Sequence, residues 1–316
     1  MSKKRMSVAN FNVVFPEERG GEEPLLKYFD SVIYPAFKSG LKRTSGDSKL
    51  LLMNVEVIDV SDGEYAIVGN LVNKTKLEVL SELDENGELI ATDNIYPAAP
   101  FSTFVIYLRN HRMVFVQNQK GSPTLSTFRS TINYIIHTYI NQINQGRKQN
   151  ELEEYPIPII NVVGIPMRES IEETLKNVKK VQTLTLRFYP LNGDFDFSGM
   201  FTGMSTQLRQ KVGSKRGEVI LKSPTSVSGI AEVLEDAGGT VEPVFKVVYP
   251  NGSTGTISND TVAERMEIEV EGNNIQEEII NIASKGKKMK AVALVSESNQ
   301  KIYEFYKPKV IQFIKK

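Results

Sequence analysis

The first half of the chain shows the alternation of apolar and polar side chains that is typical of β-strands. The alternation begins at Ser7–Phe15 and continues through a series of runs separated by turn-forming residues. Two of these turns, Ser61-Asp62-Gly63 and Glu85-Asn86-Gly87, contain residues that tolerate positive φ. Pro24–Ser39 predicts a short helix, interrupted by Pro35. The other predicted strands are Leu50–Val60, Tyr65–Leu71, Leu77–Leu83, Glu88–Thr92, Thr103–Leu108 and Met113–Gln117.

A different spacing closes this half. Between Thr124 and Asn144 the apolar residues recur three and four positions apart, which predicts a helix with one apolar face. Ser122 is the expected cap and Pro123 the expected first-turn residue. The apolar positions are Leu125, Phe128, Ile132, Ile135, Ile136, Tyr139, Ile140 and Ile143.

The polar stretch Gly146–Pro158 favours extended chain and divides the sequence. We therefore predict an N-terminal domain at 1–148, a linker at 149–157 and a C-terminal domain at 158–316. The C-terminal part alternates strands and helices, and we expect Met289–Val295 and Lys301–Tyr306 to form a hairpin. The predicted fold class is α+β: a mainly antiparallel sheet closed by a helix, followed by an α/β sandwich with helices on a mixed sheet. The remaining predicted elements are Ile159–Gly164, Arg168–Lys179, Val181–Tyr189, Met200–Val212, Glu218–Lys222, Ser226–Ala237, Glu242–Tyr249, Ala263–Val270 and Ile275–Ser284.

Composition narrows the class of protein. The 316 residues are 40% hydrophobic, with 38 Lys and Arg balanced by 38 Asp and Glu, so the chain is neither disordered nor collagen-like. No apolar run reaches the roughly 18 residues of a membrane span, and we expect no membrane association. The absence of Cys excludes disulfides and cysteine nucleophiles and fits the cytoplasm, which is the expected location.

Motifs for catalysis or cofactor binding are missing. Only His111 and His137 are available for histidine-dependent chemistry, and they fall in a predicted turn and a predicted helix. With no Cys and only these two His, a zinc site is not expected, and no phosphate-binding glycine loop occurs. We therefore assign no catalytic residue, no metal and no cofactor, and interpret the chain as a binding protein rather than an enzyme.

One pair of carboxylates keeps an enzymatic alternative open. Asp194 and Asp196 follow an apolar strand and would point the same way if the segment is extended. Two such groups can hold Mg²⁺, which would suit a metal-dependent nuclease or phosphodiesterase. The competing interpretation is a turn with two solvated aspartates, since no Glu-x-Lys follows anywhere in the chain.

Charge is unevenly distributed along the chain although it cancels overall. Acidic residues dominate between Gly229 and Ile280, including the alternating Glu267, Glu269 and Glu271, and basic residues dominate afterwards. Basic clusters could follow a nucleic-acid backbone, although a pI near 6.8 is low for a dedicated nucleic-acid domain. Opposite charges could equally pair across a protein interface. The predicted nucleic-acid or partner-binding residues are Arg209, Lys211, Lys215, Arg216, Lys285, Lys287, Lys288 and Lys290, and a third basic cluster is Lys3, Lys4 and Arg5.

The segment TFVIYLRNHRMVFVQ at Thr103–Gln117, followed by SPTLSTFRSTINYII at Ser122–Ile136, forms a predicted hairpin leading into a helix. It is similar to a segment of uncharacterised bacterial proteins that accompany phage-defence and mobile-element genes. The resemblance covers the N-terminal half and implies a role in anti-phage immunity as an effector, sensor or accessory subunit. It assigns no functional residues.

The leading hypothesis is a non-catalytic binding or assembly component, acting in an anti-phage defence system and contacting nucleic acid or a protein partner through its basic clusters. A third class is a subunit that self-assembles into a homo-oligomer, because exposed sheet edges can pair.

Overall fold

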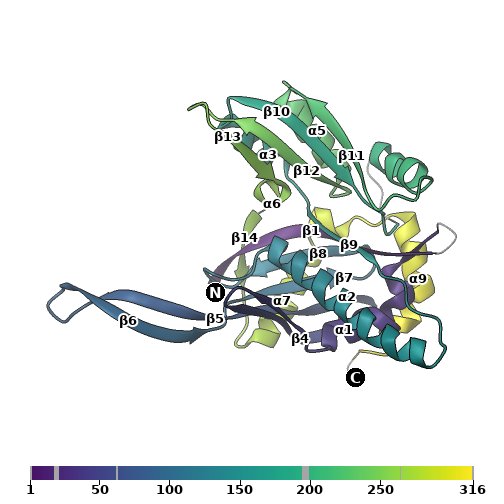
Figure 1. Ribbon diagram of the computed structural model, residues 1–316, viewed down its shortest axis with the longest axis horizontal. Coiled ribbons are helices and arrows are strands. Elements are labelled where there is room, and N and C mark those ends of the chain that lie inside the picture. Colours follow the sequence, from purple (N-terminus) through teal and green to yellow (C-terminus); the bar gives the residue numbers. More distant parts are fainter. Residues whose placement is uncertain (1, 18–20, 62, 194–198, 264, 315–316) are drawn as a thin grey trace.

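Two antiparallel sheets and the helices around them make up the protein, which confirms the α+β fold class. The computed structural model describes residues 2–17, 21–61, 63–193, 199–263 and 265–314. The larger sheet has ten strands and the smaller has four, and the smaller sheet sits beside one end of the larger one (Figure 1).

The ten-stranded sheet is built around β1, whose 15 residues pair with four other strands. Its main order is β14-β1-β8-β7-β5-β4-β3, with β2 and β9 added to β1 and β6 added to β5. The strand bounds are β1 Ser2–Pro16, β2 Glu22–Pro24, β3 Lys42–Ser45, β4 Ser48–Ser61, β5 Glu64–Leu83, β6 Leu89–Ala98, β7 Phe101–Tyr107, β8 Arg112–Gln117, β9 Ile159–Gly164 and β14 Arg265–Val270.

The four-stranded sheet has the order β11-β10-β12-β13. Its pairings are all antiparallel, where the sequence suggested a mixed sheet. The strand β13 was not predicted, since it is short and has a single buried apolar residue, Ile257. Strand bounds here are β10 Lys180–Phe188, β11 Gly217–Lys222, β12 Val241–Val248 and β13 Thr254–Ser258.

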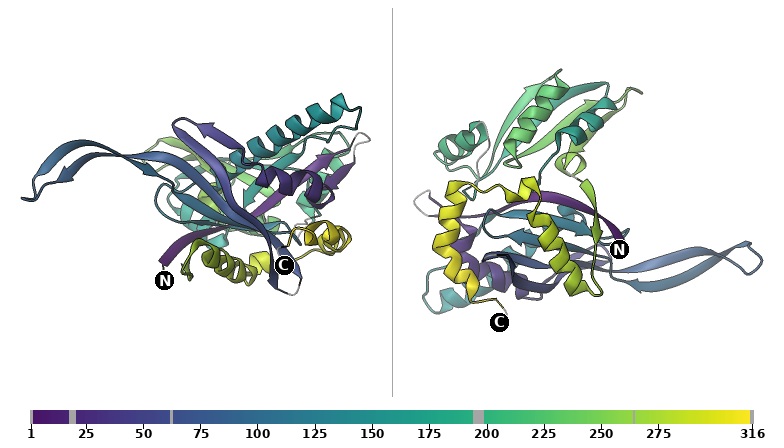
Figure 2. Two further views of the ribbon diagram at one scale, coloured as in Figure 1. Left: turned by 90° about the horizontal axis from the view of Figure 1, so that it is seen from below. Right: turned by 180° about the vertical axis from the view of Figure 1, so that it is seen from behind.

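Helices cover both faces of the large sheet. On one face the helical segment that contains α1 joins α2 over a core that includes Phe11, Phe104 and Phe128. On the other face α7 packs its buried Ile279 and Ile282 against the sheet (Figure 2). The helix bounds are the 3-10 helix η1 Leu25–Tyr28, the π-helices η2 Phe29–Ile33 and η3 Met204–Arg209, and the α-helices α1 Tyr34–Lys38, α2 Leu125–Gln149, α3 Arg168–Lys176, α4 Met200–Gly203, α5 Val227–Ala237, α6 Asn259–Val262, α7 Ile275–Lys287, α8 Lys290–Ala293 and α9 Glu297–Ile311.

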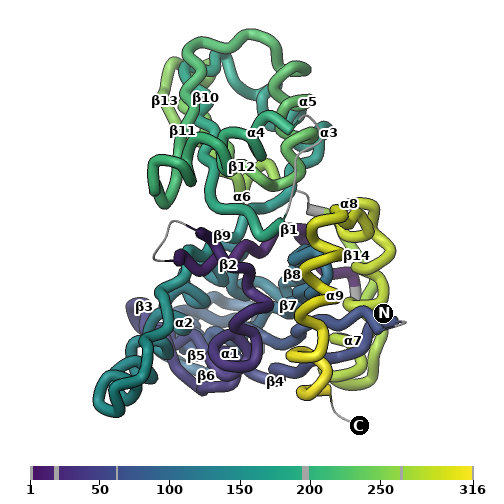
Figure 3. Tube along the Cα trace, turned by 90° about the vertical axis from the view of Figure 1, so that its right-hand side faces the viewer, coloured from purple at the N-terminus to yellow at the C-terminus, as the bar shows by residue number. Residues whose placement is uncertain are grey.

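Sheet membership does not follow the expected break at 149–157. Both β9 and β14, which come after it, pair with β1, and α7 and α9 pack on the large sheet. The small sheet and α3 to α5 therefore lie between two parts of the chain that return to the first sheet (Figure 3). The long β1 makes this arrangement work, since it offers pairing positions to strands from both ends of the sequence.

Two local predictions were wrong. The expected hairpin at 289–306 is instead α8 and α9, and Ser296 caps α9 by accepting the amide hydrogen of Asn299. Apolar residues at Ile302, Tyr303, Tyr306 and Val310 recur at helical spacing and reach the core. The cap of α2 is Thr124 rather than Ser122. The helix begins at Leu125, and the backbone amide of Thr127 donates to the Thr124 hydroxyl.

The second half of β5 leaves the sheet together with β6. Residues 75–98 form a two-stranded arm that projects from the body of the protein (Figures 1 and 2). The Glu85-Asn86-Gly87 turn expected from the sequence closes its tip, where Asp84 accepts the backbone amide hydrogens of Asn86 and Glu88.

Candidate functional site

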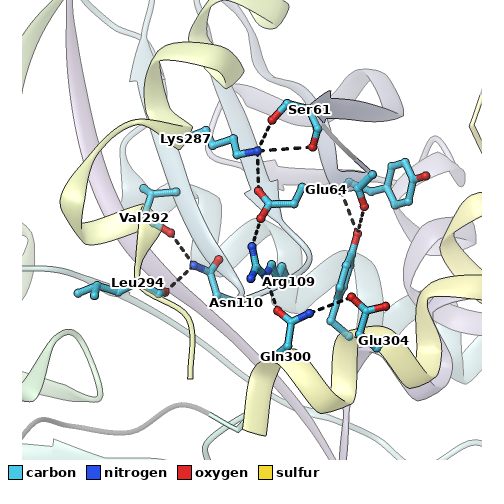
Figure 4. Close-up of polar contacts among 12 residues, drawn as sticks. Ser61, Glu64, Arg109, Asn110, Lys287, Val292, Leu294, Gln300 and Glu304 are labelled. Carbon is cyan, nitrogen blue, oxygen red and sulfur yellow. Dashed lines mark hydrogen bonds and ion pairs between the residues drawn. The ribbon is translucent and has the colours of Figure 1, made fainter. Parts of the chain in front are cut away.

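The turn between β7 and β8 carries the polar residues Arg109-Asn110-His111-Arg112 into the interior of the molecule. His111 is fully buried and has a φ of 56°, and its carbonyl accepts the amide hydrogen of Phe11. Arg109 and Asn110 point toward the C-terminal helices (Figure 4). This turn therefore joins strands of the large sheet to a segment almost two hundred residues further along the chain.

Glu64 lies between two cations. Lys287, at the end of α7, is 2.9 Å from one carboxylate oxygen of Glu64, and Arg109 contacts the other. Lys287 also donates to Ser61, next to Glu64 in space (Figure 4). Burial alone would raise the pKa of Glu64, but hydrogen bonds from Lys287 and Arg109 hold it below its ordinary value of 4.5. The carboxylate is thus ionised at neutral pH and is a weak proton acceptor.

Hydrogen bonds from the same turn hold α8 and α9. The Arg109 Nε donates to Gln300 Oε1 at 2.6 Å, and Gln300 in turn donates to Glu304. Asn110 Nδ2 donates to the carbonyls of Val292 and Leu294 at 2.6 and 2.8 Å. The last carbonyls of a helix have no intrahelical partner, and Asn110 binds two carbonyls at the end of α8.

A cavity of about 220 Å³ lies among Glu64, Tyr107, Arg109, Asn110 and Lys287. Its charged groups bind each other, and the Tyr107 hydroxyl donates to the Ala283 carbonyl of α7. Burial raises the pKa of the Tyr107 hydroxyl, so it does not ionise near neutral pH. We call Glu64, Tyr107, Arg109, Asn110 and Lys287 the latch, because their contacts connect the large sheet to the C-terminal helices.

Of the first predicted basic cluster, Arg209 is not accessible. Its side chain is 2% exposed and makes a two-fold contact with the carboxylate of Glu22, with nitrogen–oxygen distances of 2.7 and 2.8 Å. Lys211 and Lys215 are exposed, and Arg216 lies 3.9 Å from Glu218. Arg209 therefore attaches the small-sheet region to β2, while the lysines remain available at the surface.

The second predicted cluster divides in the same way. Lys287 belongs to the latch, and Lys285 donates to the Glu269 carbonyl and to Glu271. Lys288 and Lys290 are exposed. A groove of about 550 Å³ lies between Thr202 and Thr206 of α4 and η3 and Ser296–Ser298 at the start of α9, and none of the eight predicted basic residues lines it.

A second buried polar group connects the two sheets. Arg129 of α2 is 2.8 Å from Glu242 of β12, and the hydroxyl of Tyr189 donates to the same carboxylate. Burial would raise the pKa of Glu242, but hydrogen bonds from Arg129 and Tyr189 lower it. Arg112 adds a hydrogen bond to the Gly238 carbonyl. Arg129 of α2 and Arg112 of β8 thus hold the small sheet.

The remaining predicted acidic residues divide between two cases. Asp194 and Asp196 lie outside the described residues, so the nuclease alternative stays a hypothesis. In β14, Glu267 and Glu269 lie directly opposite Arg5 and Lys3 of β1. This register places unlike charges across two strands, and it joins the third basic cluster to the acidic stretch. Within the described ranges no group of three or more His, Asp or Glu is arranged to hold a metal ion.

Sequence reasoning assigned no role to the latch residues Glu64 and Arg109. A signal was present, since Arg109-Asn110-His111-Arg112 is a run of four polar residues between two strands that are buried almost throughout. Such a run predicts buried polar partners, because unpaired polar groups are costly inside a protein. The sequence could not name those partners, which lie as far away as Gln300.

Comparison with known families shows which family the chain belongs to. A family model described as a domain of unknown function, DUF4747, matches residues 4–224, and the chain belongs to this family. The match includes Glu64, Arg109 and the first basic cluster, and it ends before α7 and α9, which complete the latch. A search of curated proteins finds no match. In the part of the chain that the structure describes, no helix has the length and apolar character needed to cross a membrane.

Proposed function

We propose that this member of the DUF4747 family is a non-catalytic binding component of a larger assembly and that it holds nucleic acid through exposed basic residues. One observation supports this proposal above the others. The predicted basic residues separate into those that bind acidic partners within the chain and those for which the described residues offer no such partner, and Lys211, Lys215, Lys288 and Lys290 belong to the second group.

A balanced net charge is compatible with this function because phosphate contacts depend on local charge. Arg209, Lys285 and Lys287 are neutralised by Glu22, Glu271 and Glu64, so their substitution would act through stability. The four exposed lysines can meet phosphates at little desolvation cost. Each phosphate contact releases condensed counterions, so binding should weaken steeply as salt rises.

The test is binding of fluorescently labelled single- and double-stranded DNA and RNA, followed by anisotropy at low and moderate salt. The variants are Lys211→Ala with Lys215→Ala, and Lys288→Ala with Lys290→Ala. Each pair should weaken binding several-fold and reduce the slope of log affinity against log salt by about 2. Replacing the exposed Lys176 and Lys246 by Ala gives a matched control, which should bind as the wild type does.

Absence of binding to all four nucleic acids at low salt would refute the nucleic-acid function. The anti-phage role implied by the resemblance of Thr103–Ile136 belongs to the same proposal. It predicts that a strain carrying the native gene and its neighbours resists phage infection, and that the Lys211 and Lys215 double substitution lowers this resistance. Equal plating efficiency of phage with and without the gene would contradict it.

A further inference from the structure

The arm exposes more large apolar side chains than a free two-stranded ribbon can retain without cost. Leu80, Leu83 and Leu89 are 68, 69 and 74% exposed, and Leu77, Ile95 and Tyr96 each exceed one half. A two-stranded ribbon on its own is marginally stable in water, and clustered exposed apolar residues mark interaction sites. The arm therefore has the properties of a surface that is covered in the working protein.

The strand register gives the arm two different faces. Leu77 lies opposite Tyr96 and Leu83 opposite Leu89, which places these four residues together on one face. The other face, which we call the charged face, contains Glu78, Leu80 and Glu82 of β5. Ile95 lies opposite Glu78 and Ile90 opposite Glu82, so both isoleucines belong to the charged face.

The charged face changes sign along its length. Between Leu77 and Tyr96 the arm contains six Asp or Glu and no Lys or Arg. At the base, Lys74 lies opposite Lys49, and the two-residue period continues this face to Lys76 and, across β4, to Lys42. These four base lysines are all exposed, and within the described residues none has a side-chain hydrogen bond or an ion pair.

Glu82 and Glu88 toward the tip, Glu78 with apolar residues in the middle, and lysines at the base form a self-complementary pattern. We propose that the charged face of the arm docks antiparallel on the charged face of the arm of a second copy of this chain. A two-fold axis near Val79 brings Lys76 of each copy to Glu82 of the other and Lys74 to Glu88, and it places Glu78 opposite Leu80. The same axis packs Leu80 of each copy beside Ile95 of the other. Two-fold interfaces require this kind of pairing, in which one surface patch matches itself.

Charge complementarity selects a second copy over another occupant. An arm that is acidic along its whole length would fit any basic partner, whereas the alternation of sign from base to tip fits its own reverse. Lys76 and Glu82 are six residues apart on one strand, about 20 Å, which is a suitable span for the contact between two arms. The inference does not depend on nucleic-acid binding, because the arm, which projects from the body (Figure 1), contains none of the four lysines that the nucleic-acid proposal uses.

Two charge-reversal variants test the proposal through sedimentation equilibrium of the full chain across the micromolar range. One variant carries Glu82→Lys with Glu88→Lys, and the other carries Lys74→Glu with Lys76→Glu. The wild type should form dimers that weaken with salt, and each variant alone should associate at least about tenfold more weakly, because like charges then face each other. The altered side chains are exposed, so both variants should melt as the wild type does.

Mixing the two variants decides whether the occupant is a second copy. In the mixed dimer, lysines of one chain face glutamates of the other at both ends, so association should return to the wild-type level. A wild type that remains monomeric at low salt would overturn the proposal. So would variants that dimerise normally, or a mixture that fails to associate. Replacing residues 77–96 by a short Asn-Gly turn should leave a folded monomer, and dimerisation of that variant would also contradict the docking surface.

Discussion

Substitution of Arg209 should lower stability, although the sequence places this residue in a basic cluster that could bind a partner. In the structure the Arg209 guanidinium is buried and forms charge-assisted hydrogen bonds to both carboxylate oxygens of Glu22 and to the Ser214 carbonyl. Arg209→Ala would leave Glu22, whose side chain is 16% exposed, without its cation. It would also leave the Ser214 carbonyl without this donor.

The loss follows from the geometry. Removing one partner of a buried, hydrogen-bonded ion pair costs about 3–5 kcal/mol, and the partial exposure of Glu22 favours the lower end, about 3 kcal/mol. For a protein of this size that loss lowers the melting temperature by roughly 4–5 °C. Arg209→Lys keeps the charge that faces Glu22 but loses the separate guanidinium donors to the Ser214 carbonyl and the Ser205 hydroxyl, so it should lose about half as much.

Thermal melting by circular dichroism, together with urea unfolding, measures these effects. Lys211→Ala, two residues away and exposed, is the matched control and should melt within about 1 °C of the wild type, as surface substitutions usually do. Combining Arg209→Met with Glu22→Leu removes both charges and should recover part of the lost stability.

The reasoning fails if Arg209→Ala melts like the wild type. It fails equally if the double substitution is less stable than Arg209→Ala alone, since the cost would then not come from an unpaired Glu22. A variant of normal stability that no longer binds nucleic acid would make Arg209 a contact residue instead.

Three further predictions follow from other parts of the structure. Because the pKa of Glu64 is lowered in the folded protein, its stabilising effect is present above the ordinary carboxyl pKa of 4.5 and is lost as pH falls through the folded-state value. The unfolding free energy of the wild type should therefore drop more on acidification than that of Glu64→Gln. Parallel pH profiles of the two proteins would contradict this. Gly286→Ala should lower the unfolding free energy by about 1–3 kcal/mol in urea unfolding, because a Cβ there would overlap the Tyr107 hydroxyl and lie 3.0 Å from Val114. Gly146→Ala, whose Cβ would meet open space, should stabilise α2 by up to about 1 kcal/mol. Glu242→Gln should loosen the small sheet, seen as faster amide hydrogen exchange in β12 with unchanged exchange in β7; equal exchange in both strands would contradict the role of Arg129 and Glu242.

Much of the candidate site was out of reach of the sequence for a specific reason. The charge runs were visible in the sequence, and Lys211 and Lys215 of the first cluster are exposed. Which cations are neutralised depends on contacts between distant residues. Arg209 meets Glu22 across 187 positions, and no local pattern encodes that distance.

The sequence by itself determined the local elements. Alternation predicted β1, β4, β7 and β8, three- and four-residue spacing predicted α2, and Ser226 and Asn274 cap α5 and α7 as their types favour. These features depend on neighbours within one or two turns, where side-chain direction and backbone hydrogen bonding decide the outcome. The tertiary structure alone decided that β9 and β14 return to β1 and that the arm stands free of the body. Those outcomes depend on which distant surfaces bury apolar area against each other. The free energy of that burial is determined by the whole chain rather than by one segment of it.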